Sequence, residues 1–397
     1  MPSTPVMDRW ISRTVERHLP FNVHFDLTYR CNERCVHCYL DHEDYGEMTT
    51  AEVKGVLDQL AAAGTLFLTF SGGEIFLRKD FFELLAYARK LHFDVSLKTN
   101  ALLINPERAS RLREMGVRRI QISIYSADPA VHDAITRVPG SLGRSLQAIR
   151  FLKGQGLQVK IACPLMKQNL TAFRTVQSLA EELGVPYILD LTITPMIDGN
   201  HRTLALRSSG LELLPVLQDP VLNPRLKGDQ EALRDGGASA SALGSATSSG
   251  MESCVYDDIP CSAGHNSCYI SPYGDVYPCV QMPLPTGSVR RQSFEEIWYG
   301  SPQMRRVRDI RESHLTVCST CSIRQYCERC PGLAQMEGGD LLGAYERACE
   351  LAELNARLAG VENPVSALHQ QRATQPAHTA LAGAPLGLVG IASMSTA

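Results

Sequence analysis

The chain has 397 residues, 44% of them hydrophobic, and a formal net charge of −3. The length allows a substantial core and two domains, and the nearly balanced charge gives no indication of nucleic acid or an anionic membrane as a partner. No apolar run approaches the roughly 18 residues needed to span a bilayer, and residues 1–20 carry charges where a secretory signal has an apolar segment. We therefore expect a cytoplasmic protein that binds neither nucleic acid nor membrane.

The first part of the chain alternates between strand and helix patterns. Residues 1–20 are expected to form a short helix or arm and residues 23–28 a strand. Thr49 and Thr50 are expected to cap a helix whose apolar positions are Val53, Val56, Leu57 and Leu60. Further strands are predicted at residues 66–70, 93–98, 119–124, 157–163 and 187–194. Helices are predicted between them at residues 80–91, 106–115, 142–155 and 171–183. Six β-α repeats with apolar strands indicate an α/β fold, either a partial (β/α)6 barrel of the TIM type or a doubly wound sheet.

Composition divides the chain further. The barrel or sheet is assigned to residues 21–235, and the run rich in Gly, Ala and Ser that follows it, within 236–253, is predicted to be a flexible linker. A cysteine-rich domain is assigned to residues 254–355. The tail at residues 356–397 is rich in Ala, Gly and Pro and has no periodicity, so we expect it to be disordered.

Cysteine is the most informative residue type. The 13 cysteines are an odd number for a set of disulfides, and ten of them fall in three tight groups. In a reducing compartment such grouping indicates metal binding rather than disulfide formation. The sequence therefore predicts that these thiols are metal ligands, with iron as the expected metal.

Cys31, Cys35 and Cys38 follow the first predicted strand with the spacing CxxxCxxC. Three thiolates at this spacing can hold three irons of a [4Fe–4S] cluster and leave the fourth iron open. A zinc site with a remote fourth ligand, or a chance grouping of thiols, would use the same residues. Tyr39 directly after the third cysteine, and the segment Ser71-Gly-Gly-Glu74 one β-α unit later, favour the iron cluster.

These motifs resemble those of the radical S-adenosylmethionine (SAM) superfamily, in which SAM chelates the open iron. The resemblance implies a partial barrel rather than a doubly wound sheet, and reductive cleavage of SAM to methionine and a 5′-deoxyadenosyl radical. It also implies that SAM is bound by residues at the ends of the second, third and fourth strands: Ser71, Gly72, Gly73, Glu74, Thr99, Asn100 and Ser123. A Thr-Asn pair after a strand is also a common helix cap, so Thr99 and Asn100 have a structural alternative.

The C-terminal cysteines, with the segment Gly274-Asp-Val-Tyr-Pro-Cys279 among them, resemble a SPASM domain, which carries two auxiliary [4Fe–4S] clusters. By that resemblance the first auxiliary cluster is bound by Cys261, Cys268, Cys279 and Cys330. The second is bound by Cys318, Cys321, Cys327 and Cys349. The spacing between Cys327 and Cys330 is one residue shorter than in many relatives, which leaves the partition of ligands open, and a pair of zinc ribbons would use CxxC pairs equally well.

Four further residues have no assigned ligand role: Cys254, Cys163, His132 and Asp133. Cys254 is expected to be a bystander. Cys163, at the end of the fifth predicted strand, is a buried thiol by the commonest rule, or a hydrogen donor to a substrate radical as in radical epimerases. His132 and Asp133 lie in a segment that resembles peptide-maturing radical SAM enzymes, where they either hold substrate or cap the following helix.

Among the functions that the resemblance allows, we favour modification of a ribosomally made peptide by a thioether or carbon–carbon crosslink, because Cys279-Val-Gln and Cys330-Pro-Gly-Leu-Ala look most like such enzymes. The alternatives are an anaerobic sulfatase-maturing enzyme, an enzyme of haem-variant or quinone-cofactor biosynthesis, a peptide epimerase, and a non-catalytic electron-transfer or iron-sensing protein. The implied cofactors are three [4Fe–4S] clusters and SAM. The implied partners are a precursor peptide, a separate small winged-helix protein that recognises it, and a flavodoxin- or ferredoxin-type reductant.

Overall fold

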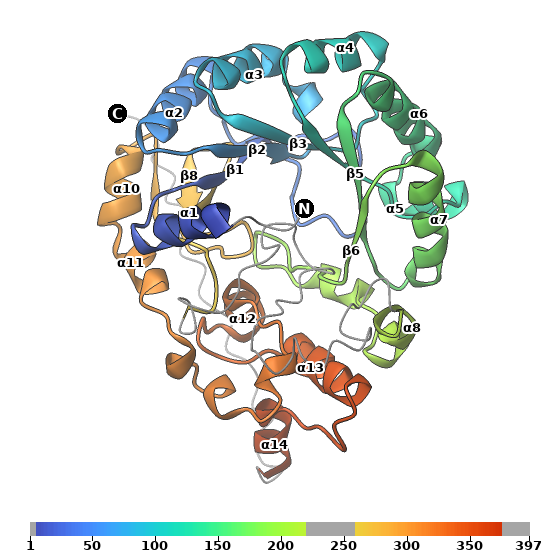
Figure 1. The fold of residues 1–397 in the computed structure, drawn as a ribbon, viewed down its shortest axis with the longest axis vertical. Coiled ribbons are helices and arrows are strands. Elements are labelled where there is room, and N and C mark those ends of the chain that lie inside the picture. Colours follow the sequence, from blue (N-terminus) through green and yellow to red (C-terminus); the bar gives the residue numbers. More distant parts are fainter. Residues whose placement is uncertain (1–4, 220–258, 375–397) are drawn as a thin grey trace, which may run out of the picture.

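The computed structural model describes residues 5–219 and 259–374, so the predicted linker at 236–253 and Cys254 lie outside the described residues. Six parallel strands follow one another in the sheet in the order β6-β5-β4-β3-β2-β1. They are β1 (Asn22–Thr28), β2 (Phe67–Gly72), β3 (Asp94–Thr99), β4 (Arg119–Ser123), β5 (Gln158–Pro164) and β6 (Tyr187–Asp190). A doubly wound sheet reverses its strand order, whereas here each strand lies beside its neighbour in sequence. The partial barrel is therefore confirmed (Figure 1).

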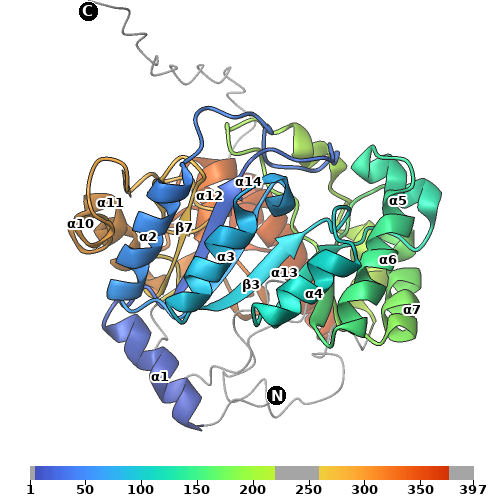
Figure 2. The same cartoon turned by 90° about the horizontal axis from the view of Figure 1, so that it is seen from above.

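Helices cover the outside of this curved sheet, as both views show (Figures 1 and 2). They are α2 (Thr50–Ala62), α3 (Phe81–Lys90), α4 (Pro106–Glu114), α6 (Ser141–Gly154) and α7 (Phe173–Leu183). Thr49 caps α2 as predicted, in a reciprocal pair of hydrogen bonds with Glu52. Three helices of this part lie outside the repeat: α1 (Pro5–Glu16), in the expected N-terminal arm, α5 (Pro129–Thr136) and α8 (Leu214–Leu217). The sequence pattern did not predict α5 or α8.

The two faces of the strands differ sharply in polarity. On β1, Val23, Phe25 and Leu27 are fully buried and pack in one core with apolar side chains of the outer helices. Successive strand residues point to opposite faces, so His24 and Asp26 point into the barrel. TIM barrels fill their interior with branched apolar side chains. A polar interior in place of such a core indicates a space for ligands.

The cysteine-rich domain continues the barrel sheet. Its first strand, β7 (Ser267–Ile270), pairs in parallel with β1, and β8 (Asp275–Tyr277) and β9 (Gly287–Ser288) extend the sheet to nine strands. The helices that follow are α10 (Phe294–Gly300), α11 (Pro302–Arg308), α12 (Pro331–Gly338), α13 (Glu346–Leu358) and α14 (Ala367–Thr374). Figure 1 shows α12 and α13 on the open side of the ring of strands, between β6 and β8. The domain thus closes the side that the partial barrel leaves open.

The prediction of a disordered tail from residue 356 is wrong for its first part. Helix α13 continues to Leu358 and α14 covers Ala367–Thr374, while residues 375–397 lie outside the described residues. Polar contacts hold α14 in place: His369 bonds to Glu353 at 2.6 Å and to Glu346 at 2.8 Å. Because these contacts are polar, the sequence of this segment shows no apolar periodicity. Its composition therefore did not predict the helix.

Deletion of all residues after 250 should give a barrel that does not fold. Phe294, Ile297 and Trp298 of α10 are fully buried in the same core as β1 and α2, and loss of one large buried aromatic side chain alone costs about 3–5 kcal/mol. We expect insoluble protein without a cooperative thermal transition, measured by soluble yield and circular dichroism. A chain that ends at residue 374 is the matched control and should melt like the full chain. A soluble, cooperatively folded barrel from the shorter deletion would contradict this view of the core.

Candidate active site

The three cysteines of the CxxxCxxC motif lie in the loop after β1, at the carboxyl end of the barrel, where such folds place their active sites. Asn100 of the β3 end lies 3.8 Å from the Cys31 sulfur through its amide nitrogen. The Tyr125 hydroxyl, beyond the end of β4, donates to the Cys35 sulfur at 3.7 Å. The loop is therefore enclosed by the ends of two neighbouring strands.

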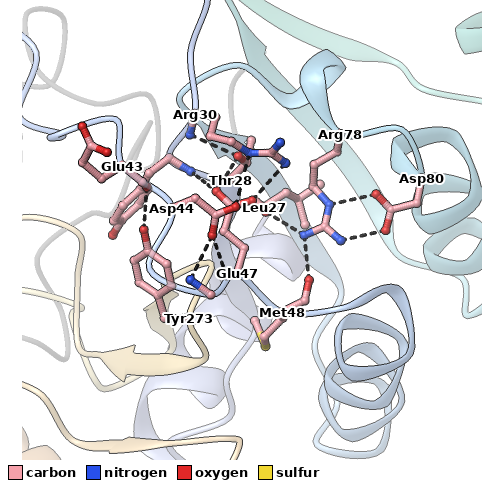
Figure 3. Close-up of polar contacts among 12 residues, drawn as sticks. Leu27, Thr28, Arg30, Glu43, Asp44, Glu47, Met48, Arg78, Asp80 and Tyr273 are labelled. Carbon is pink, nitrogen blue, oxygen red and sulfur yellow. Dashed lines mark hydrogen bonds and ion pairs between the residues drawn. The ribbon is translucent and has the colours of Figure 1, made fainter. Parts of the chain in front are cut away.

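The base of this loop is held by two charged residues that sequence reasoning missed (Figure 3). Glu47 accepts hydrogen bonds from the Thr28 hydroxyl at 2.6 Å and from the Tyr29 backbone at 2.9 Å. The buried Arg78 donates to the backbone oxygens of Leu27 and Met48 at 2.9 and 3.1 Å. Both residues thereby join the chain entering the loop to the chain leaving it, which fixes the cysteines relative to β1.

Gly72 and Gly73, at the end of β2, pack closely against the backbone that leads into the same loop. A Cβ on Gly73 would lie 2.3 Å from the Arg30 backbone oxygen, and one on Gly72, whose φ is +132°, would lie 2.1 Å from the Thr28 oxygen. Their close approach is fixed by hydrogen bonds from the backbone nitrogens of Gly73 and Glu74 to the oxygens of Thr28 and Arg30, at 2.8 and 2.9 Å. Glycine is required here because no side chain fits between the two backbones.

Glu74 is fully buried, and its carboxylate oxygens accept hydrogen bonds from donors of the protein. It accepts two contacts from the Thr99 hydroxyl, at 2.9 and 2.8 Å, and one from the Asn100 backbone at 2.9 Å. Burial raises its pKa, and these donors counteract that effect. Glu74 and Thr99 therefore join the ends of β2 and β3, and direct contact of either residue with SAM stays a prediction. The Asn100 side chain also has a protein partner, Asn32, at 2.7 Å.

The remaining SAM candidates, Ser71 and Ser123, point into the barrel from β2 and β4. Ser71 is buried and Ser123 is half-buried, close enough to hydrogen-bond the Tyr125 hydroxyl. Tyr125 was not singled out from the sequence, because an aromatic residue after a strand is common in cores. Its ring packs edge-on against His37, with ring centroids 5.0 Å apart.

His132 and Asp133 have supporting roles. The His132 Nδ1 atom accepts from the Tyr125 backbone at 3.2 Å. Asp133 accepts from Ser141 and Leu142 at the start of α6, at 2.8 and 3.1 Å. The helix-capping interpretation is therefore right for Asp133, and His132 holds the backbone of Tyr125.

Cys163 does not point into the barrel. It is fully buried in the core between sheet and helices, on the same face of β5 as Ile161. Its sulfur lies 3.6 Å from the Tyr125 backbone oxygen, and burial raises its pKa. The hypothesis that Cys163 donates hydrogen to a substrate radical is therefore wrong, because the sheet itself lies between its side chain and the barrel interior.

The thiols of the cysteine loop fit a group that carries positive charge. Burial raises the pKa of Cys31 to about 12 and that of Cys38 to about 11, and the neighbouring Cys38 thiolate adds to the shift of Cys31. Without metal these residues stay protonated, and three thiolates this close need a cation to hold them. A single zinc ion would need ligands about 2.3 Å from one centre, and residues 5–219 and 259–374 contain no group of three His, Cys, Asp or Glu side chains placed to hold one ion.

The C-terminal thiols form two sets by their mutual electrostatic effects. Burial and then the Cys261 and Cys330 thiolates raise the pKa of Cys279 to about 12, and Cys279 in turn raises that of Cys268. In the other set, burial and then Cys349, Cys318 and Cys321 raise the pKa of Cys327 to about 12, although Arg324 acts against them. The thiols that affect one another in this way fall within the two ligand sets that the resemblance implies, and their binding of clusters stays a prediction.

Two buried arginines point to anionic groups at these sites. Among the described residues, Nη2 of Arg308 and Nη1 of Arg329 have no hydrogen-bond partner. Burial raises the pKa of Cys268, Cys318 and Cys330, and the arginine charges act against that rise. Arg308 acts in this way on Cys268, and Arg329 acts on Cys318 and Cys330. A buried donor without a partner is costly, and the sulfur atoms of an iron-sulfur cluster would supply the missing acceptors. The residues present therefore fit such clusters.

Comparison with known proteins agrees with this geometry. A family model described as the radical SAM superfamily matches residues 25–180, and one described as an iron-sulfur cluster-binding domain, SPASM, matches residues 261–322. The chain is 30% identical over 338 residues to the AdoMet-dependent heme synthase of Methanosarcina barkeri, which covers 81% of this chain and 94% of that protein. The chain belongs to the radical SAM superfamily.

Other radical SAM proteins are similar over most of their length. The mycofactocin maturase MftC of Mycobacterium tuberculosis is 30% identical over 319 residues, covering 78% of this chain and 77% of that protein. Among solved structures, Streptococcus suis SuiB bound to its precursor peptide SuiA has a TM-score of 0.65 at 17% identity, covering 86% of this chain and 80% of that one. A structure of anSMEcpe with bound AdoMet and a peptide has a TM-score of 0.62 at 17% identity, covering 86% and 97%. At this identity the structures establish the fold alone.

The radical SAM assignment settles the class of chemistry. The chain is an enzyme with iron-sulfur clusters and SAM as cofactors, and the alternative of a non-catalytic electron-transfer or iron-sensing protein is wrong. No helix in the described part of the chain is long and apolar enough to cross a membrane.

Proposed function

We propose that this radical SAM enzyme modifies a ribosomally made precursor peptide by forming a thioether or carbon–carbon crosslink. The observation that carries the proposal is the position of the second domain: β7, with Cys268, pairs directly with β1, whose end leads to Cys31. Tyr269, the residue after Cys268, hydrogen-bonds through its hydroxyl with Tyr29 and Asp26, so the second domain borders the barrel interior. The similarity to MftC, which is named a mycofactocin maturase, and the likeness in fold to SuiB bound to a precursor peptide support a peptide substrate.

We propose the ligand sets that the resemblance implies. Cys31, Cys35 and Cys38 would hold the cluster that binds SAM, and the eight C-terminal cysteines would hold two auxiliary clusters. When bound and reduced, the first cluster supplies the electron that splits SAM into methionine and a 5′-deoxyadenosyl radical. The chain's own residues fix the position of this site: Glu47, Arg78 and Gly73 hold the cysteine loop, and Tyr125 contacts Cys35.

The electron count explains why two domains have to meet. A crosslink removes two hydrogens from the peptide, one as a hydrogen atom taken by the 5′-deoxyadenosyl radical and the other as a proton and an electron. The electron needs an acceptor close to the substrate. The first auxiliary group meets that requirement, because Tyr269, next to Cys268, hydrogen-bonds through its hydroxyl with Tyr29, two residues before Cys31, at 2.6 Å.

A tetrapyrrole substrate is the second candidate. It is favoured by one observation, the similarity to AdoMet-dependent heme synthases over 94% of the length of the Methanosarcina barkeri protein. For either substrate we include a flavodoxin- or ferredoxin-type reductant as partner. A separate winged-helix protein that recognises the precursor belongs to the peptide proposal alone.

The test is anaerobic incubation of reconstituted enzyme with SAM, a chemical reductant, and the peptides encoded by short reading frames beside its gene. Formation of a crosslink should lower the mass of one peptide by two hydrogen atoms, and fragmentation should locate the bond. The Cys31→Ala variant is the control and should leave every peptide unchanged. Unmodified peptides together with a mass change in iron-coproporphyrin III would contradict the peptide proposal and favour the second candidate.

A further inference from the structure

The inner face of the barrel sheet carries a row of polar side chains in register across five strands. Asp26 on β1 pairs with Ser71 on β2, Lys98 on β3 pairs with Gln121 on β4, and Gln121 pairs with Lys160 on β5. Continuation of the β2–β3 register places Ser71 beside Lys98. Neighbouring strands lie about 4.8 Å apart, so the backbones of Lys98 and Lys160 are separated by about 10 Å, with Gln121 between them.

Both lysines face the interior. Leu97 before Lys98, and Ile161 after Lys160, are buried in the core between sheet and helices. Strand alternation then directs the two lysines to the opposite face. Lys98 is exposed to solvent and Lys160 is half-buried, although burial lowers the pKa of both. Side chains that are accessible and yet surrounded by protein project into a solvent-filled space within the barrel.

The carboxylates around this space already have partners, whereas the lysines have none. One oxygen of Asp26 lies 3.0 Å from the His24 ring nitrogen, and the other accepts from the Tyr269 hydroxyl at 2.9 Å. Asp190 on β6 accepts from the Thr192 backbone at 2.8 Å. Within residues 5–219 and 259–374 the ammonium groups of Lys98 and Lys160 make no hydrogen bond and no ion pair. Each ammonium group has three donors to offer.

The electrostatics of the pair favour an anion. The charge of Lys98 lowers the pKa of Lys160, so the two ammonium groups repel each other. Asp26 and Asp190 act on Lys98 at longer range without forming a contact. Charge-assisted bonds to one carboxylate shared by both lysines would relieve the repulsion and satisfy the free donors.

Lys98 lies beside the predicted SAM residue Ser71 but farther from the cysteine loop than Asn100. Asn100, two residues farther along β3 than Lys98, is the residue that contacts Cys31. The charge of Lys98 acts instead on Cys279 of the first auxiliary group. The row thus lies deeper in the barrel than the cysteine loop, on the way to the second domain, where a substrate has to lie if its electron leaves through that domain.

We propose that Lys98 and Lys160, with Gln121 between them, form an anion site on the inner wall of the barrel that binds a carboxylate of the substrate. The inference rests on the proposed function in that it takes the barrel interior as the substrate site. In a peptide the carboxylate belongs to an acidic side chain or to the C-terminus. A tetrapyrrole would present the same chemistry through its propionates.

The test measures dissociation constants of the fully reconstituted enzyme with SAM bound. The probes are three pools of synthetic octapeptides and iron-coproporphyrin III. The first pool has one Glu and an amidated C-terminus, and the second has Gln in place of the Glu. The third has the Gln peptides with a free C-terminal carboxylate. The wild-type enzyme should prefer a carboxylate probe over the Gln pool. The double variant Lys98→Met, Lys160→Met should weaken binding of that probe about tenfold or more and remove the preference, while the Kd for SAM stays unchanged.

Three controls keep this test decisive. Lys79→Met alters an exposed lysine and should bind like wild type, and Lys98→Arg should keep most of the affinity because the charge remains. Iron content identifies a variant that fails to fold. A lysine-dependent preference for iron-coproporphyrin III alone would support the anion site and contradict the peptide function. Absence of any preference for carboxylates, a preference that survives in the double variant, or an equal loss of SAM binding would overturn the proposal.

Discussion

Replacement of Cys31, Cys35 and Cys38 together by Ala should remove about one third of the bound iron and abolish SAM cleavage. Eleven ligands in three groups predict about twelve irons per chain, as three clusters of four. The loop cysteines lie on the segment after β1, whereas the C-terminal groups use cysteines of the second domain. The two remaining clusters should therefore stay.

The measurement is iron and sulfide analysis of anaerobically reconstituted protein, with 5′-deoxyadenosine quantified in the same samples. Cys163→Ala is the matched control, since Cys163 lies in the core and should contribute no iron. Zinc in place of iron in the wild type, or loss of all metal in the triple variant, would show that the three groups are not independent iron sites.

The barrel could be predicted because each of its elements carries its own local pattern. Val23, Phe25 and Leu27 alternate with polar residues as a strand with one buried face requires. Thr49 and Glu52 mark the start of α2 by their spacing alone. Such signals depend on neighbours in sequence and need no knowledge of distant contacts.

The continuation of the sheet into the second domain could not be predicted in this way. Strand β7 has four residues and includes Cys268, so its pattern is too short to identify, and its partner β1 lies far away in sequence. The hydrogen bond between Tyr29 and Tyr269 joins residues 240 positions apart. Contacts between segments so far apart depend on the complete fold, and neither segment carries a local sequence pattern that predicts them.

Within the site, the sequence motifs predicted which residues lie together. The role of each residue depends on its hydrogen-bond partners, which the motifs did not show. Glu74 was placed correctly at the end of β2, but its oxygens are taken by Thr99 and Asn100. For Cys163 the signal was available, since it shares strand parity with the buried Ile161. Lys98 precedes Thr99 in the segment that the resemblance assigns to SAM, and its position across Gln121 from Lys160 depends on strand register that the sequence alone does not show.

Gly73→Ala should cost the enzyme its SAM-binding cluster while leaving the protein folded. The added Cβ would lie 2.3 Å from the Arg30 oxygen and 2.6 Å from the Tyr29 oxygen. These are backbone atoms, and they cannot retreat without moving Cys31, the next residue. Overpacking of this size costs about 1–3 kcal/mol, which a domain of ordinary stability survives. We therefore expect about two thirds of the wild-type iron, little 5′-deoxyadenosine, and a modestly lower melting temperature.

The matched control is Gly143→Ala in α6, where an added Cβ meets no atom within 4 Å. It should keep full iron and full SAM cleavage. The pair of readouts separates two roles for Gly73. If Gly73→Ala keeps all its iron but loses SAM cleavage, the glycine faces SAM itself, as the sequence motif alone suggested, and the loop does not depend on it. If both iron and cleavage are unchanged, the close approach of β2 to the cysteine loop has no part in holding the cluster. Loss of the loop iron together with cleavage is the result expected from the contacts of Gly73 with Tyr29 and Arg30.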